Sequence, residues 1–293
     1  MSYSDLVKTR IVTITGIGLL ATLIAAAATA SPTRRVVAAF YPVAYAAQEI
    51  GGSTVVVRNL TPAGAEPHDL ELKPSDVVSV QRADLVLYLG DGFQPAVEKA
   101  VASTHAHGVD LLAGFKLSRG KDEQGNPAVD PHVWLDPLRY AQIASRIGRA
   151  LGRPRATAAY IARLHALDAQ YRAGLAHCTR KTIVTSHAAF GYLAARYGLT
   201  QLALEGMSPE AEPSPKALAK LIGEVRRSQA TTVFFETLVS PKLAETVARN
   251  AHVKTAVLDP IEGLTPDAVE HGATYFTVMR ANLVALRLAL GCS

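Results

Sequence analysis

The stretch RATAAYIARLHALDAQYRAGLAH, which runs from Arg155 to His177, decides how the chain is organised. Apolar side chains recur in it every three or four positions, the spacing of one face of an α-helix; they are Tyr160, Leu164, Leu167, Tyr171 and Leu175. A helix of this length spans roughly 33 Å, the diameter of a small domain. We therefore predict a rigid backbone helix at residues 154–177 that packs against two lobes, because a flexible linker would be rich in glycine and serine.

The chain alternates strand-like and helix-like segments on both sides of this helix. Strands are predicted at residues 36–40, 54–60, 85–89 and 108–112 before it, and at 182–185, 201–204, 231–235 and 254–258 after it. Such alternation is typical of a parallel sheet with helices on both faces. The sequence thus predicts an α/β fold with two (βα)-type lobes, residues 31–153 and 178–293. Each lobe has a central, mostly parallel four-stranded sheet, and the backbone helix joins them.

The sequence also predicts one surface loop and one C-terminal helix. Residues 117–129 are polar and contain glycine, which predicts a surface loop. Residues 266–290 begin with proline and continue in a helical pattern, which predicts one C-terminal helix.

The first 30 residues differ from the rest of the chain. Lys8 and Arg10 precede an uncharged run from Ile11 to Ala30, which ends in small residues. This pattern is typical of a secretory signal peptide, so we expect residues 1–30 to be removed and the body to be exported to the periplasm or cell envelope. The run is also about long enough to span a bilayer, and an uncleaved N-terminal anchor is the alternative.

Composition and cysteine content limit the partners and the compartment. The 293 residues carry a formal net charge of +5, and only 6% are aromatic. Neither a nucleic-acid surface nor a base-stacking platform is indicated. The two cysteines, Cys178 and Cys292, favour an intramolecular disulfide if the protein is exported to an oxidising compartment, with two free thiols as the alternative.

One histidine lies in an unusually rigid loop. The stretch DPHVWLDP, from Asp130 to Pro137, sets His132 between two Asp-Pro turns and beside the only tryptophan, Trp134. Proline restricts the backbone and often opens a helix, so His132 is expected at a helix entrance. A single loop histidine is more often structural than functional, and the assignment depends on whether other residues converge on it.

Other polar residues stand just after predicted strands, where ligands bind in parallel α/β sheets. His68 follows the strand at 54–60, and His187 follows the strand at 182–185. Glu236 and Asp259 come directly after the next two strands along the second half. Together with His132 these residues predict one site built from both halves of the chain.

Three imidazoles and one carboxylate suit zinc, with manganese as the alternative, whereas magnesium and calcium prefer shells of oxygen. We predict that the ligands are His68, His132, His187 and Asp259. Glu236 is expected to accept a hydrogen bond from an imidazole and to orient it. A helix N-terminal carboxylate is an equal alternative for Glu236. Glu66 is an additional candidate ligand.

Several motifs, taken in order, resemble the zinc and manganese solute-binding proteins of ABC transporters, known as the cluster A-I family. They include PHD at Pro67–Asp69, DPHVWLDP, SHAAFGY at Ser186–Tyr192 and LDP at Leu258–Pro260, within about residues 35–290. The resemblance implies two lobes with one metal ion in the cleft between them, and it places the family's ligands on the four residues predicted above. Manganese members usually carry glutamate at the position of His187, which favours zinc. The histidine-rich loop of many zinc members is short here, at 118–129, and contains no histidine.

The resemblance implies an exported receptor, not an enzyme, that delivers zinc to an ABC permease in the membrane. The chain contains no G-x-x-x-x-G-K-[ST] phosphate loop, so a partner ATPase would supply the energy. We expect a monomer. The alternatives are a zinc-dependent hydrolase, in which Glu66 would be the general base, a manganese receptor, and a metal-dependent adhesin.

Overall fold

The computed structural model describes residues 33–121, 126–209 and 214–293, and Thr33–Ser293 form one compact unit. The expected signal peptide, residues 1–30, lies outside the described residues. No helix in the described part is long and apolar enough to cross a membrane. The predicted division into lobes at residues 153 and 178 stays a prediction, although two separate sheets are present.

The first sheet contains four parallel strands in the order β2-β1-β3-β4. The strands are β1 (Arg34–Ala38), β2 (Val55–Asn59), β3 (Leu85–Tyr88) and β4 (Gly108–Asp110). Helices α1 (Tyr41–Gly51), α2 (Pro74–Arg82) and α3 (Pro95–Thr104) connect them, with a 3₁₀ turn, η1 (Gly52–Thr54), before β2. The valines of β1 are buried, as the β-branched run predicted.

The second sheet also contains four parallel strands, in the order β10-β9-β7-β8. They are β7 (Thr182–Thr185), β8 (Thr200–Ala203), β9 (Thr232–Phe235) and β10 (Lys254–Val257). Between them lie η3 (Ala188–Phe190), α6 (Gly191–Tyr197), α7 (Pro215–Arg227) and α8 (Lys242–Ala251). The predicted α/β fold with two parallel four-stranded sheets is confirmed.

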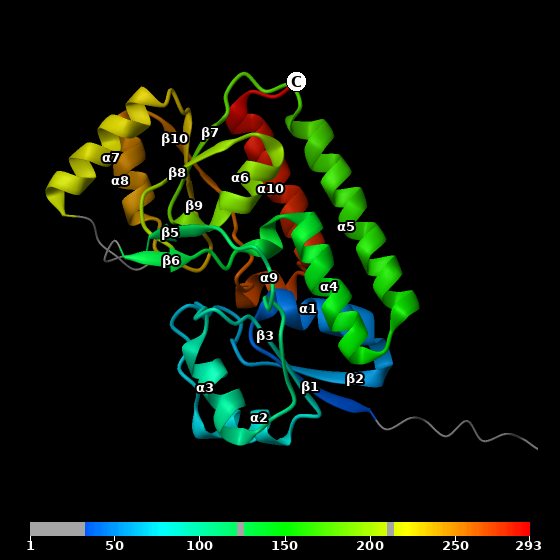
Figure 1. Ribbon diagram of the computed structural model, residues 1–293. Helices are drawn as coiled ribbons and strands as arrows, with labels where there is room; N and C mark the ends of the chain where they lie inside the picture. Colours follow the sequence, from blue (N-terminus) through cyan, green and yellow to red (C-terminus); the bar gives the residue numbers. More distant parts are fainter. Residues whose placement is uncertain (1–32, 122–125, 210–213) are drawn as a thin grey trace, which may run out of the picture. The chain divides into compact units, whose positions relative to one another are not determined.

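The predicted backbone helix is α5 (Pro154–Leu175), and all five residues of its apolar stripe are buried. It packs against α4 (Pro137–Leu151) and α10 (Tyr275–Leu290), beside which it runs in Figure 1. The hydroxyl of Tyr171 donates a hydrogen bond to the backbone oxygen of Met279 at 2.6 Å, which fixes α5 on α10. One continuous core joins the first sheet to these three helices, so α5 is a packed element of the core.

The disulfide between Cys178 and Cys292 is present, as predicted. The backbone nitrogens of Thr179 and Arg180 also donate to the oxygens of Gly291 and Leu290. The end of the chain is therefore attached to the segment that leads into β7.

Two local predictions were wrong. The segment predicted as a surface loop contains an antiparallel hairpin of β5 (Arg119–Lys121) and β6 (Pro127–Val129). The single C-terminal helix is divided into α9 (Pro266–Glu270) and α10. The division occurs because Gly272 has a φ of +71°, a left-handed conformation that ends a helix, and Thr274 then caps α10.

Candidate metal site

The rigid loop DPHVWLDP places His132 between β6 and the start of α4. Asp130 Oδ1 accepts hydrogen bonds from both the backbone nitrogen of His132 (3.0 Å) and its ring Nδ1 (2.8 Å). The loop continues through the 3₁₀ turn η2 (Val133–Leu135), and the carboxylate of Asp136 caps α4. Asp130 therefore fixes the orientation of the imidazole, a role that the sequence analysis did not assign to it.

Trp134 connects this loop to a second loop far along the chain. Its Nε1 donates a hydrogen bond to the backbone oxygen of Pro260 at 2.7 Å. The indole ring packs edge-on against Phe40, with ring centres 4.8 Å apart, and lies 5.2 Å from the ring of His132. The indole thus holds together the loops that contain His132 and Pro260.

His187 follows β7 and is oriented in a similar way. Its ring Nδ1 lies 2.7 Å from Glu236 Oε1, and its backbone nitrogen donates to the same oxygen at 3.2 Å. Glu236 follows the neighbouring strand β9, so adjacent strands of the sheet supply the histidine and its carboxylate partner. A carboxylate at Nδ1 keeps that nitrogen as a donor, and the other nitrogen, Nε2, faces Glu262.

His68 lies in the loop between β2 and α2. Its backbone nitrogen donates to Glu66 Oε1 at 3.1 Å, and its ring packs edge-on against Phe93. The side chain of His68 is 11% exposed, whereas those of His132 and His187 are completely buried. Of the three histidines, His68 is the one in contact with solvent.

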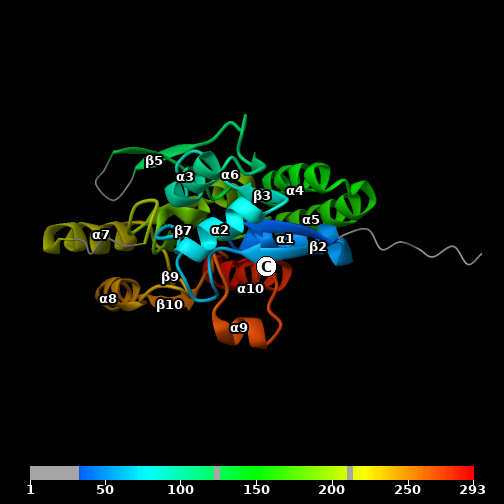
Figure 2. The same cartoon turned by 90° about the horizontal axis from the view of Figure 1, so that it is seen from below.

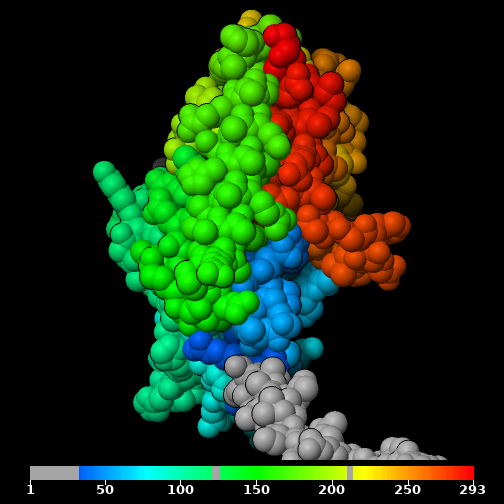
Figure 3. All heavy atoms as spheres, turned by 90° about the vertical axis from the view of Figure 1, so that its right-hand side faces the viewer, coloured from blue at the N-terminus to red at the C-terminus, as the bar shows by residue number. Residues whose placement is uncertain are grey.

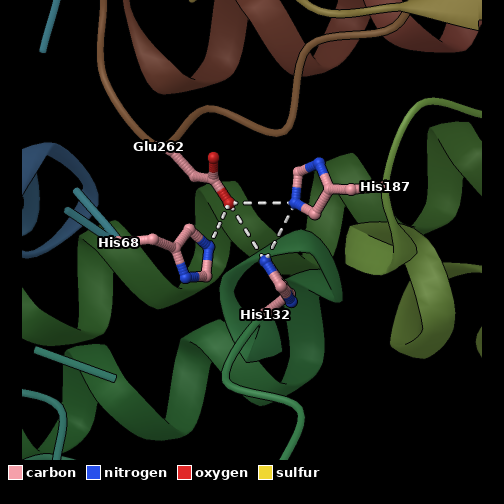
Figure 4. Close-up of side chains that lie close together, drawn as sticks. All are labelled: His68, His132, His187 and Glu262. Atoms are coloured by element: carbon pink, nitrogen blue, oxygen red, sulfur yellow. Dashed lines mark hydrogen bonds and ion pairs between the residues drawn. The ribbon is translucent and has the colours of Figure 1, made fainter. Parts of the chain in front are cut away.

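The three imidazoles converge on one carboxylate, that of Glu262, as Figure 4 shows. Glu262 Oε1 lies 3.2 Å from Nε2 of His68, 3.0 Å from Nε2 of His132 and 3.3 Å from Nε2 of His187. These four ligand atoms all lie within 4.8 Å of one another, and Glu262 is 1% exposed. Within the described residues, this is the one group of histidine, cysteine and acidic side chains with the geometry to hold a metal ion.

Asp259, which the sequence analysis places among the ligands, does not join this group. Its Oδ2 accepts a hydrogen bond from the hydroxyl of Thr237 (2.8 Å), and its Oδ1 accepts one from the backbone nitrogen of Ile261 (2.7 Å). Ile261 has a φ of +57°, so the chain turns sharply there and brings Glu262 to the histidines. Glu262 is a second carboxylate in the same Asp-Pro loop, but it lies beyond Asp259, the residue directly after the predicted strand.

Glu66, the additional candidate, also lies outside the group of four. Its Oε2 is buried and has no hydrogen-bond partner among the described residues, while Oε1 accepts a hydrogen bond from the backbone nitrogen of His68. Burial, together with the negative charge of Glu262, raises the pKa of Glu66 to about 8. The neutral acid is therefore favoured at this position.

The charges within the site strongly affect the pKa values of its buried histidines, His132 and His187. Burial lowers the pKa of His187, but the carboxylates of Glu236 and Glu262 outweigh this effect and raise it well above the usual range. His132 behaves likewise: burial lowers its pKa, but hydrogen bonds to the carboxylates of Asp130 and Glu262 outweigh burial and raise it. Burial also raises the pKa of Glu262, yet the surrounding imidazoles bring it well below its usual value. The site therefore favours positive charge beside an ionised Glu262.

Three imidazole nitrogens and one carboxylate oxygen form a donor set that suits zinc and other first-row transition metals. Carboxylates bound to Nδ1 of two of the histidines, His132 and His187, complete the arrangement common around such ions. Magnesium and calcium, which prefer oxygen ligands, fit this set poorly.

Comparison with known proteins agrees with this chemistry. Residues 36–289 match the family described as "Zinc-uptake complex component A periplasmic". The zinc-binding protein AdcA of Streptococcus pyogenes is 36% identical over 285 residues, which cover 87% of this chain and 55% of the relative. The high-affinity zinc uptake system protein ZnuA of Bacillus subtilis is 34% identical over 277 residues and is matched over 87% of both chains.

A solved structure shares the fold. The Zn(II)-bound ZnuA-like domain of Streptococcus pneumoniae AdcA superposes with a TM-score of 0.76 at 34% identity, over 88% of this chain and 99% of that domain. The chain spans about half the length of the S. pyogenes relative that it matches. Because the family match covers residues 36–289, this protein belongs to the zinc-uptake complex component A family.

Proposed function

We propose that this protein captures a zinc ion outside the cytoplasm and delivers it to an ABC permease. The observation that carries the proposal is the convergence of three imidazole nitrogens on the buried carboxylate of Glu262, at 3.0 to 3.3 Å. The family and the names of the relatives support zinc as the cargo and transport as the role.

The ligands in this proposal are His68, His132, His187 and Glu262. Asp130 and Glu236 hold His132 and His187 with Nε2 directed at the ion. Glu262 replaces Asp259, because the carboxylate of Asp259 is already held by Thr237 and Ile261.

Zinc is favoured over manganese by the donor set. Three imidazoles and one carboxylate form a compact shell of four donors, and zinc in structural sites is almost always four-coordinate. Manganese is better matched by sites richer in oxygen. Competition between Zn²⁺ and Mn²⁺ for the metal-free protein, followed by elemental analysis, tests this choice; retention of manganese in the presence of equal zinc would reverse it.

The partners follow from the role. A receptor of this kind delivers its ion to a membrane permease, and hydrolysis of ATP belongs to a separate subunit, because the sequence contains no phosphate-binding loop. The family description supports a location outside the cytoplasm. The protein would act as a monomer.

A zinc hydrolase would need an open position on the metal for a water molecule. With Glu262 as the fourth ligand, no such position remains. Hydrolysis of ester or peptide substrates that is lost on treatment with EDTA would therefore contradict the proposal.

The direct test is equilibrium binding. We expect one zinc ion per chain, and we expect His187→Ala to weaken binding by orders of magnitude. His165→Ala is the matched control, because His165 is exposed on α5 and is not among the four residues that converge on one another. In cells that depend on this protein for zinc, His187→Ala should also prevent growth under zinc limitation, and growth equal to that of the control would contradict a transport role.

A further inference from the structure

Six arginines that are not part of the metal site lie at the end of the first sheet where β1 begins. We call this surface the basic end; its residues are Arg34, Arg35, Arg82, Arg149, Arg153 and Arg155. Two of them open β1, one ends α2, and three flank the turn between α4 and α5. The guanidinium of Arg34 joins these elements, because it donates to the backbone oxygens of Ala150 (2.6 Å) and Asp84 (3.4 Å).

Most of the basic end has no acidic partner. Four of its arginines are exposed and form no ion pair with any carboxylate among the described residues; they are Arg82, Arg149, Arg153 and Arg155. The carboxylates on neighbouring elements are already paired, Asp84 with Arg35 at 3.2 Å and Glu49 with Arg163 at 2.6 Å. The positive charge of the four arginines is thus not neutralised within the described chain.

The position of two of these arginines is unfavourable for the helix that they begin. Arg153 is the N-cap residue of α5, and Arg155 lies in its first turn, which contains no acidic residue. The N-terminal end of a helix carries a partial positive charge and is stabilised by anions. Helix stability therefore does not explain why arginine occupies positions 153 and 155. The helix dipole adds to the positive potential at these positions.

Apolar surface lies beside the charges. A hollow of about 250 Å³ next to Arg35 and Arg82 is lined partly by valines. Two of these are unusually exposed for their type, Val56 at 61% and Val78 at 41%. Basic and apolar groups together are what a surface needs to bind at the boundary between lipid headgroups and acyl chains.

The basic end is also where the described chain begins. The uncharged run Ile11–Ala30, about long enough to span a bilayer, ends three residues before Thr33 in the sequence. In Figure 3 the dark blue start of β1 lies on the surface next to the green residues of α4 and α5. If a membrane retained the apolar run, the first described residues to follow that run in the sequence would include Arg34 and Arg35 of the basic end.

We propose that the basic end docks onto a membrane surface by binding the phosphate groups of anionic phospholipids. One arginine guanidinium group can donate two parallel hydrogen bonds to a phosphate group. Clusters of basic residues are also attracted to anionic bilayers. Docking would leave the metal site uncovered, because His68 follows the carboxyl end of β2 while the basic end lies at the amino end of β1, and the two strands are parallel. The inference does not depend on the proposed zinc transport.

The test is sedimentation with lipid vesicles, using the chain from Ser31 onward, which contains the whole compact unit and its core. This chain should bind vesicles of phosphatidylcholine mixed with phosphatidylglycerol, and should not bind vesicles of phosphatidylcholine alone. Added salt should weaken the binding, because it screens exposed charges. The double substitution Arg153→Glu/Arg155→Glu should weaken it by about tenfold or more, given the attraction that each basic residue contributes near an anionic bilayer.

The matched control is Lys216→Glu/Arg227→Glu, which changes the net charge by the same amount. Both residues are exposed on α7, which lies away from β1 and the α4–α5 turn in Figures 1 and 2. This variant should bind as the unchanged protein does. Thermal unfolding of both variants establishes that each is folded. Equal losses in the two variants, binding to heparin without binding to vesicles, or no vesicle binding by the unchanged protein would each overturn the proposal.

Discussion

Glu262 Oε1 lies 3.0 Å from His132 Nε2, although 130 residues separate them and the backbone helix α5 lies between them in the chain. The contact depends on two anchors. Asp130 orients the imidazole, and the indole of Trp134 bonds to Pro260, two residues before Glu262. The two halves of the chain thus meet at one carboxylate, and the proposed metal site exists only where both are folded.

The assignment of Glu262 in place of Asp259 leads to the first prediction. Glu262→Gln should weaken zinc binding by more than the roughly 10- to 100-fold typical of an outer carboxylate, because it removes a charged ligand. Asp259→Asn should leave the affinity close to that of the unchanged protein, because its carboxylate bonds to Thr237 and Ile261. Calorimetric titration of both variants decides between them, and the opposite ranking would restore Asp259 as the ligand.

Glu236 provides a second prediction, which concerns orientation and not ligation. Glu236→Gln keeps the size of the side chain but removes the charge that faces His187 Nδ1 at 2.7 Å. Zinc affinity should fall by about 10- to 100-fold while the stoichiometry remains one ion per chain. Glu245→Gln, on α8 with a side chain that is 45% exposed, is the control. An unchanged affinity in Glu236→Gln would mean that its carboxylate serves only to cap the local backbone.

Zinc affinity should depend on pH in a defined direction. The pKa values of His132 and His187 are raised by their carboxylate partners, so both rings hold protons at higher pH than free histidine does. A metal ion must displace these protons, so affinity should fall as the pH decreases through the raised pKa values and should rise above them. Calorimetry in buffers of different ionisation enthalpy counts the protons released. An affinity that is flat from mildly acidic to neutral pH would exclude a site of three histidines.

The disulfide should contribute stability without contributing to the site. Cys178 and Cys292 are 114 residues apart in sequence, and closing a loop of this length is worth about 4 to 5 kcal/mol in the chain-entropy model, with measured values of about 2 to 5. The variant Cys178→Ala/Cys292→Ala should lose a free energy of unfolding in that range, measured by denaturant titration. Its zinc affinity should be unchanged at a temperature where it is folded; a loss of affinity in the folded variant would show coupling between the chain end and the site.

Much of the fold could be predicted because it depends on local patterns. The alternation of strand-like and helix-like segments predicted every strand of the two main sheets, and the apolar stripe from Tyr160 to Leu175 predicted α5 almost to its ends. The hairpin of β5 and β6 could not be found this way, because each strand has three residues and the segment around them is polar and contains glycine. Gly272 marks the break between α9 and α10, but the helical pattern on both sides of this glycine favours a single continuous helix.

The candidate site was predictable as far as it follows strand ends. His68 and His187 each follow a strand of a parallel sheet, where ligands commonly bind, whereas His132 was located from the rigid loop DPHVWLDP. Glu262 was not predictable from that rule, because it lies beyond the strand end and reaches the histidines through the turn at Ile261. The contact between Asp130 and His132 could have been predicted from the sequence, because an aspartate two residues before a histidine can accept hydrogen bonds from both its backbone and its ring.

We expect one zinc ion to bind between His68, His132, His187 and Glu262. Crystals grown with zinc and measured on both sides of the zinc absorption edge test it most directly. We expect one anomalous peak per chain, about 2.0 to 2.1 Å from the Nε2 atom of each of the three histidines and bounded on its fourth side by the carboxylate of Glu262. A peak bounded by Asp259, or the absence of a peak among the three histidines, would contradict it.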